Sequence, residues 1–137
     1  MLKKRSQVSL EFLTIVGFAL VMLFPLVIIF NSESEAIKDQ LYGNQIENIC
    51  RTIVDKAESM YYLGSPSQTT LKVMFPPRIE NVTITNRELK FYYINSNNDI
   101  QEIYETSLIN ITGSVSSHSG IHYILIKAEG DYVSITD

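Results

Sequence analysis

The chain has 137 residues and a formal net charge of −4 at pH 7, from 11 basic and 15 acidic residues. This length predicts one domain with a modest hydrophobic core, and the single cysteine, Cys50, excludes an internal disulfide framework and a cysteine zinc site. Because Lys3, Lys4 and Arg5 are the one cluster of basic residues, the acidic remainder argues against nucleic acid as a general partner.

The first predicted element is an apolar helix directly behind this basic cluster. Phe12 to Phe30 carries no charge and is long enough to cross about 30 Å of hydrocarbon as a helix. A secretory signal peptide cut near Ala36, or a plain N-terminal anchor with its basic end in the cytoplasm, would fit part of this pattern. Neither explains the lone carboxylate of Glu11 at the start of the run, since an ionisable group at membrane depth is costly and indicates function.

The residues around Glu11 resemble a known processing signal. Gln7-Val8-Ser9-Leu10-Glu11-Phe12, between the basic leader and the apolar run, is similar to the class III signal peptide of archaeal type IV pilin-like proteins. The resemblance implies that a prepilin peptidase cuts between Ser6 and Gln7, so that residues 1–6 are a leader. Ser6 stands where glycine or alanine is expected, but it is also small. The resemblance is close in this segment and extends to the remainder only in layout.

The resemblance also implies an assembly role for Glu11 and Gln7. A carboxylate near a helix N-terminus interacts favourably with the helix dipole. It can also attract the new N-terminal group at Gln7 of a neighbouring subunit, which lowers the cost of a charge in hydrocarbon. The alternative is that Glu11 lies among the lipid headgroups, reaches water and has no part in assembly.

The second predicted element, residues 32–64, is an amphipathic continuation of the same helix. Its apolar residues recur mostly three or four apart and predict one buried stripe: Ile37, Leu41, Ile46, Ile49, Ile53, Val54, Ala57 and Met60. Gly64-Ser65-Pro66 is typical of a helix end. One helix is therefore expected from Val8 to Leu63, with Pro25 kinking it or loosening one turn.

After residue 66 the apolar period changes to two, which predicts a β domain at residues 65–137. Strands are expected at 70–75, 79–85, 88–94, 100–106, 108–112, 121–128 and 132–136. Hairpins are expected across Asn86-Arg87 and across residues 129–131, with loops at 95–99 and 113–120. Four to six antiparallel strands would form one sheet, with one face in water and the other on the helical stripe. The predicted fold class is α+β and pilin-like, and the helix divides into an apolar part at 7–31 and the amphipathic part at 32–64.

Residues that could carry chemistry are few. His118 and His122 lie four apart in a loop-to-strand segment without a carboxylate or cysteine at ligand spacing, so we expect exposed histidines and no metal site. Cys50 is expected to be a buried thiol, and the tyrosines are expected mostly in core and cross-strand packing. The sequence has no phosphate-binding loop and no serine-elbow motif, so we expect neither an enzyme nor a cofactor.

Two tripeptides mark expected glycosylation sites in the β domain. Asn81-Val82-Thr83 and Asn110-Ile111-Thr112 are N-glycosylation sequons, with Asn81 and Asn110 as acceptors. Glycans at these positions would add hydrophilic bulk to an extracellular surface.

The resemblance implies a structural subunit of an archaeal type IV pilus-like surface filament, with adhesion as the expected role. Its expected partners are copies of itself or sibling pilins, the prepilin peptidase, and the assembly ATPase and membrane platform protein. The subunit would first span the cell membrane once, with its β domain outside, and then enter the filament. The alternative is a monomeric, membrane-anchored extracellular binding domain.

Overall fold

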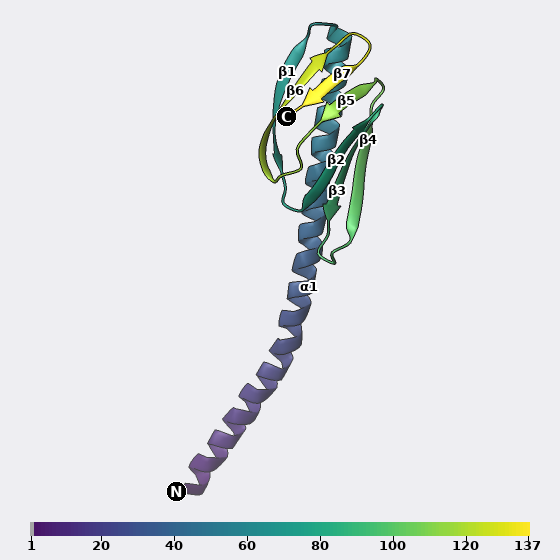
Figure 1. Cartoon of the computed structure of the whole chain (residues 1–137). Coiled ribbons are helices and arrows are strands. Elements are labelled where there is room, and N and C mark those ends of the chain that lie inside the picture. Colours follow the sequence, from purple (N-terminus) through teal and green to yellow (C-terminus); the bar gives the residue numbers. More distant parts are fainter. Residues whose placement is uncertain (1) are drawn as a thin grey trace. The chain divides into compact units, whose positions relative to one another are not determined.

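The computed structural model describes residues 2–137, with side chains from Val8 onward. One helix, α1 (Leu2–Leu63), precedes seven strands (Figure 1). The chain forms two compact units, Met1–Ile37 and Lys38–Asp137, and α1 contributes to both. The predicted α+β class, a long N-terminal helix packed against β-sheets, is confirmed.

Helix α1 ends where the sequence predicts. Gly64 follows its last residue with φ 81°, a left-handed conformation that glycine adopts without a Cβ penalty. The Gly64 amide donates to the carbonyl oxygens of Met60 and Tyr61 at 3.2 and 3.0 Å, which caps the last turn. The backbone is α-helical without interruption through Pro25.

The β domain contains two sheets. The four-stranded sheet has the order β1 (Gln68–Phe75), β6 (Gly120–Ala128), β7 (Val133–Thr136) and β5 (Ile111–Ser114). The three-stranded sheet has the order β2 (Ile79–Thr85), β3 (Glu88–Ile94) and β4 (Ile100–Thr106). The prediction of a single sheet is therefore wrong, because β1 pairs with the distant β6 and not with its neighbour β2.

The pairing of strands confirms both predicted hairpins and corrects one strand. Thr85 pairs with Glu88 across the Asn86-Arg87 turn, and β6 pairs antiparallel with β7. The fifth strand was predicted at 108–112 as an antiparallel strand, but β5 starts at Ile111, includes Gly113 and runs parallel to β7. A parallel neighbour comes from far along the chain, so alternation within residues 108–112 does not reveal it.

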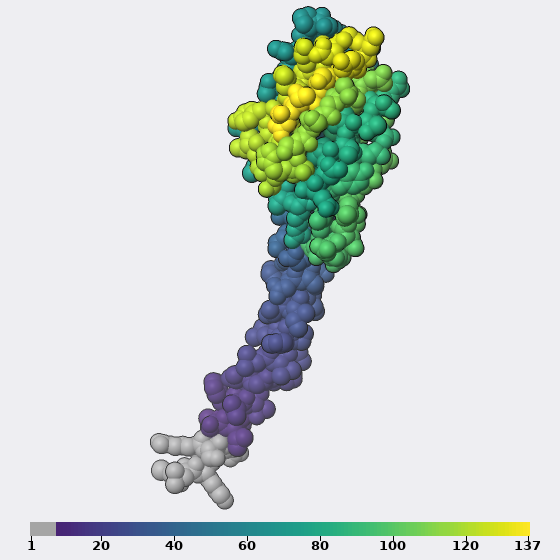
Figure 2. Space-filling model, viewed as in Figure 1, coloured from purple at the N-terminus to yellow at the C-terminus, as the bar shows by residue number. Residues whose placement is uncertain are grey.

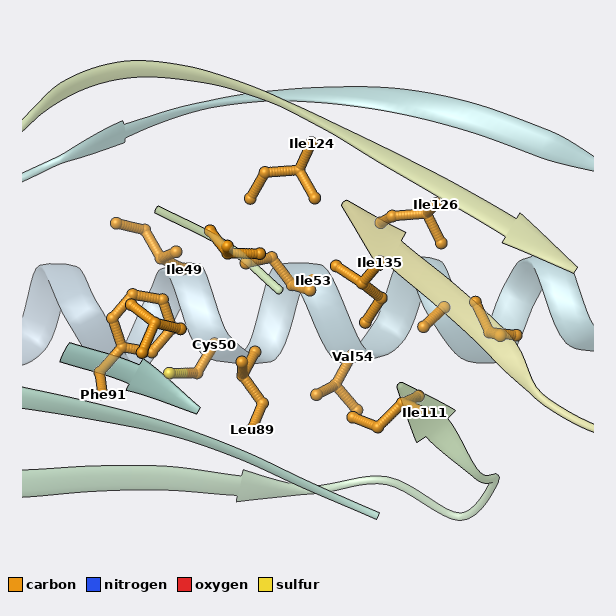
Figure 3. Packing of buried hydrophobic residues seen from close by; sticks show 14 of the residues in the cluster. Ile49, Cys50, Ile53, Val54, Leu89, Phe91, Ile111, Ile124, Ile126 and Ile135 are labelled. Atoms are coloured by element: carbon orange, nitrogen blue, oxygen red, sulfur yellow. The ribbon is translucent and has the colours of Figure 1, made fainter. Parts of the chain in front are cut away.

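The core lies between the C-terminal part of α1 and the inner faces of both sheets (Figure 3). Ile49 and Ile53 lie on the side of the helix that faces Ile124 of β6, whereas Cys50 lies toward Leu89 of β3. Along β6, exposed and buried residues alternate from Ile121 to Ile126, as expected for a strand with one face in water. The helical stripe is thus shared between two sheets.

The first two members of the predicted stripe are not part of this core. Ile37 and Leu41 are 56 and 53% exposed, whereas Ile46 is fully buried. Leu41 and Ile46 are five residues apart, a step that turns about 140° beyond one full helical turn. Leu41 therefore faces away from the sheets, and the buried stripe begins at Ile46.

Asp39 lies on the part of α1 that belongs to the unit Lys38–Asp137. Its hydrogen bonds hold the loop between β3 and β4. Its carboxylate accepts hydrogen bonds from the Ser96 amide, at 2.9 Å, and from the Ser96 hydroxyl, at 2.8 Å. Arg78 lies 3.6 Å from the same carboxylate. The Ser96 amide, the Ser96 hydroxyl and then the Arg78 charge all lower the pKa of Asp39, because each favours its ionised form.

Replacing Asp39 is expected to destabilise the β domain in a pH-dependent way. A carboxyl with a lowered folded-state pKa stabilises the fold above its unfolded pKa of about 3.9, and this contribution disappears as pH falls through the folded value. Asp39→Asn should therefore lower the urea midpoint of the full chain in detergent at pH 7, and the difference from the parent should shrink at pH 3. Asp55→Asn, a control on the exposed side of α1, should change little at either pH. An equal difference in urea midpoint between Asp39→Asn and the parent at pH 3 and at pH 7 would contradict a stabilising role of the ionised carboxylate.

The predictions of burial for the Cys50 thiol and of packing for the tyrosines have different outcomes. Cys50 is fully buried as expected, and this burial raises the pKa of its thiol to about 12. The prediction of core and cross-strand packing for the tyrosines is confirmed in part: Tyr61 and Tyr93 pack against the core, although no tyrosine that the structure describes is fully buried. Tyr62, Tyr104, Tyr123 and Tyr132 are exposed. Tyr123 lies on the outward face of β6, and the Nζ atom of Lys72 on the paired strand β1 lies 5.8 Å from the centre of its ring.

Candidate functional site

The apolar segment of α1 exposes its large side chains throughout. Every large hydrophobic residue from Val8 to Phe30 is exposed, and none of the most apolar stretch is buried. Figure 2 shows side chains of this segment, in purple and blue, at the surface of the visible face. The helix is long and apolar enough to cross a membrane, as membrane anchors and signal sequences are.

Polar side chains in and after this segment bond to the helix itself. The Thr14 hydroxyl donates to the carbonyl oxygen of Leu10 at 2.8 Å, and the Ser34 hydroxyl donates to that of Phe30 at 2.9 Å. Ser32 does the same toward Ile29 at 2.8 Å. Such bonds lower the cost of placing a hydroxyl near hydrocarbon, because the donor keeps a partner without water.

Glu11 is the one charged residue between Val8 and Phe30. Its side chain is exposed, one turn before Thr14 and beside Leu10 and Ile15. A carboxylate on an otherwise apolar helical surface is available to a positive or hydrogen-bond-donating partner. The predicted cleavage residues, Ser6 and Gln7, lie outside the residues whose side chains are described, so the cleavage site and the pairing of Gln7 with Glu11 stay predictions.

Both sequons lie on the surface of the β domain. Asn81 is exposed on β2 beside an irregularity in the pairing with β3, and its side-chain oxygen accepts from the Val82 amide at 2.9 Å. Asn110 is exposed just before β5, and its side-chain oxygen accepts from Arg87 at 3.3 Å. Exposure makes both amides accessible for modification, and glycosylation itself stays a prediction.

The histidines form a cluster that sequence spacing did not indicate. His122 is 1% exposed, so the prediction of two exposed histidines is wrong for this residue, whereas His118 is exposed. The Nδ1 atom of His122 lies 2.5 Å from Oδ2 of Asp137, and its Nε2 atom lies 2.7 Å from the His118 carbonyl oxygen. The expectation of no metal site depended on the lack of a nearby carboxylate in the sequence. The β6–β7 hairpin supplies one, because it returns the chain to His122 at Asp137.

Comparison with protein-family models, with curated proteins and with solved structures finds no match to the chain. The class of protein is therefore defined by its architecture. A long N-terminal apolar helix followed by a small β-sheet domain is a pilin-like arrangement.

Proposed function

We propose that this chain is a structural subunit of an archaeal type IV pilus-like surface filament and that it polymerises through its apolar helix. One observation carries the proposal: every large side chain between Val8 and Phe30 is exposed, whereas the described core begins at Ile46. The apolar segment thus lacks partners within the described chain, and lipid or neighbouring helices are the environments in which such a surface is stable.

Glu11 distinguishes a polymerising helix from a simple anchor. An anchor needs apolar length and flanking charge, and a carboxylate within its inner boundary adds cost without benefit. In a filament, Glu11 of one subunit pairs with the N-terminal group of Gln7 in the next, which gives the carboxylate a partner and sets the register between helices. The basic leader, residues 1–6, has to be removed by a prepilin peptidase before this pairing forms.

The apolar helix and the β domain have separate places in the proposed assembly of the subunit. It first spans the cell membrane once with the β domain outside, and an assembly ATPase with its membrane platform protein then moves it into the filament. Copies of this chain or sibling pilins surround the helix. The β domain forms the coat, where Asn81 and Asn110 are in position to carry glycans and the exposed surface serves adhesion.

Imaging of sheared surface filaments, with mass spectrometry of their subunits, tests this function. We expect filaments that contain this chain with Gln7, or its pyroglutamate form, as the first residue. A mature chain that begins at Met1 or near Ile37 would contradict processing by a prepilin peptidase. A chain that stays in the membrane as a detergent-extractable monomer would favour the other candidate, an anchored extracellular binding domain.

Replacing Glu11 is expected to reduce assembly and to leave the subunit intact. Glu11→Gln should cut the filament yield at least about tenfold, the factor that corresponds to about 1.4 kcal/mol per contact. Membrane insertion and the circular dichroism spectrum should match those of the parent, because Glu11 lies outside the described core. Glu33→Gln, which removes the same charge from the same helix beyond the apolar run, is the matched control. Equal filament yields for Glu11→Gln and the parent would show that the carboxylate only borders the membrane.

A further inference from the structure

The cluster at the end of β7 contains two histidines and a carboxylate from three separate segments. His118 lies in the loop between β5 and β6, His122 in β6, and Asp137 directly after β7. One potential ligand atom from each residue lies within 4.8 Å of the other two. The cluster is distinct from the apolar helix, on which the proposed function depends.

The proton positions on His122 follow from its neighbours. Its Nε2 atom faces the backbone carbonyl oxygen of His118, which can only accept a hydrogen bond, so Nε2 carries a proton. A neutral ring protonated at Nε2 has its lone pair on Nδ1, and this atom faces the Asp137 carboxylate at 2.5 Å. Two acceptors at this distance need a positive species between them. At 2.5 Å that species is a proton, and a metal ion with bonds of about 2.0–2.2 Å to both atoms fits only after the two atoms move apart.

The surroundings of His122 are those of a metal-binding histidine. Histidine ligands usually donate their second ring nitrogen to a backbone carbonyl or carboxylate, which fixes the tautomer and the ring orientation. His122 makes this bond, and its ring stacks on Phe75 with centroids 4.0 Å apart. The ring of His118 lies 4.1 Å from that of His122 on centroids, and its Nδ1 atom bonds to the Ser116 hydroxyl at 2.6 Å. The orientation of both rings is thus held before any ion binds.

Solvent reaches the cluster at His118 and Asp137. His122 is buried, but His118 is exposed and the Asp137 side chain keeps 17% of its surface in contact with solvent. An ion can therefore enter past His118 and Asp137 while His122 forms the inner wall. Imidazole and carboxylate together suit zinc and neighbouring transition metals and are a poor set for magnesium or calcium, which bind oxygen ligands.

We propose that His118, His122 and Asp137 bind one divalent transition-metal ion of the zinc class, with water completing its coordination. The ion takes the place of the proton between His122 and Asp137, and that proton is released to solvent. Small shifts of His118 and Asp137, both on the surface, bring three ligands to the bond lengths that zinc requires. The bound ion ties the loop before β6 to the end of β7 and stabilises this end of the four-stranded sheet.

Titration of the metal-free full chain in detergent with Zn²⁺ and Co²⁺ tests the site. We expect one zinc ion per chain, visible absorption bands on addition of Co²⁺, and a rise in the thermal midpoint of several degrees at saturating zinc. Mg²⁺ at the same concentration should produce neither effect. His118→Ala and Asp137→Asn should each weaken zinc binding at least about tenfold, as losses around metal sites do. Asp131→Asn removes an equal charge from the exposed β6–β7 turn and should bind zinc like the parent.

The variants separate metal binding from a structural role of the pair. Circular dichroism checks that each variant is folded. If Asp137→Asn does not fold, zinc binding by His118→Ala alone tests the site, because His118 is exposed and its replacement should leave the fold intact. Failure of the folded parent to bind zinc would overturn the proposal and show that His122 and Asp137 share only a proton. Zinc binding that is unchanged in folded His118→Ala would also overturn it, since the ion would then lie elsewhere.

Discussion

A chain that begins at Glu33 is expected to be a soluble monomer, whereas the mature chain should need detergent or polymerisation. The described core begins at Ile46 and continues through both sheets, so removal of the apolar segment takes away no core residue. Each large apolar side chain that leaves water contributes about 1.5–3 kcal/mol. Many such side chains line the segment from Val8 to Phe30, so we expect this segment to contribute most to association.

Analytical ultracentrifugation and circular dichroism of the shortened chain check this expectation. We expect a monomer with mixed helix and strand signals and a cooperative thermal transition. Shortened chains that still form filaments would place the assembly surface in the β domain. An unfolded shortened chain would show that the domain needs neighbouring subunits, or the first part of α1, to be stable.

Replacing Gly113 by alanine is expected to destabilise the four-stranded sheet by about 3 kcal/mol or more. Gly113 has φ 142°, and a Cβ atom at this position would lie 1.8 Å from the carbonyl oxygen of Ile135 in β7. That atom belongs to the backbone of the paired strand and cannot rotate away, so β5 and β7 must separate. Denaturant unfolding of the full chain in detergent measures the loss.

Gly130 is the matched control because it also has a positive φ, 96°, but a Cβ atom there would meet no neighbour within 4 Å. Gly130→Ala should cost about 1–2 kcal/mol, the price of left-handed backbone alone. Equal losses for the two variants would show that backbone strain, and not contact with β7, sets the effect at Gly113.

The elements of this fold could largely be predicted, because their signals are local. The helix end at Gly64 and the strands at 79–85, 88–94 and 100–106 agree with the structure. Alternation of apolar residues and the position of glycine and proline depend on a few neighbouring residues, and such patterns are readable in a single sequence. The apolar segment and Glu11 were equally visible, because charge and its absence are properties of the sequence itself.

Features that depend on pairing between distant strands were missed. The division into two sheets requires β1 to pair with β6 and not with β2, and no local sequence pattern indicates this pairing. Burial of His122 beside Asp137 follows from the same sheet, since the β6–β7 register brings the two residues together. The stripe error has another origin: Leu41 was grouped with Ile46 although a five-residue step changes the face of a helix.

The position of β6 in the middle of its sheet also sets the order in which a newly made chain can fold. Strands β2, β3 and β4 can pair once residue 106 has emerged from the ribosome, because each follows the last along the chain. Strand β1 has to wait, since the partner of Gln68 is Lys127. Until β6 is made, the face of α1 that carries Ile49 and Ile53 lacks its cover. A ribosome that stalls before residue 120 therefore leaves an apolar helical face open to aggregation and to quality-control proteases.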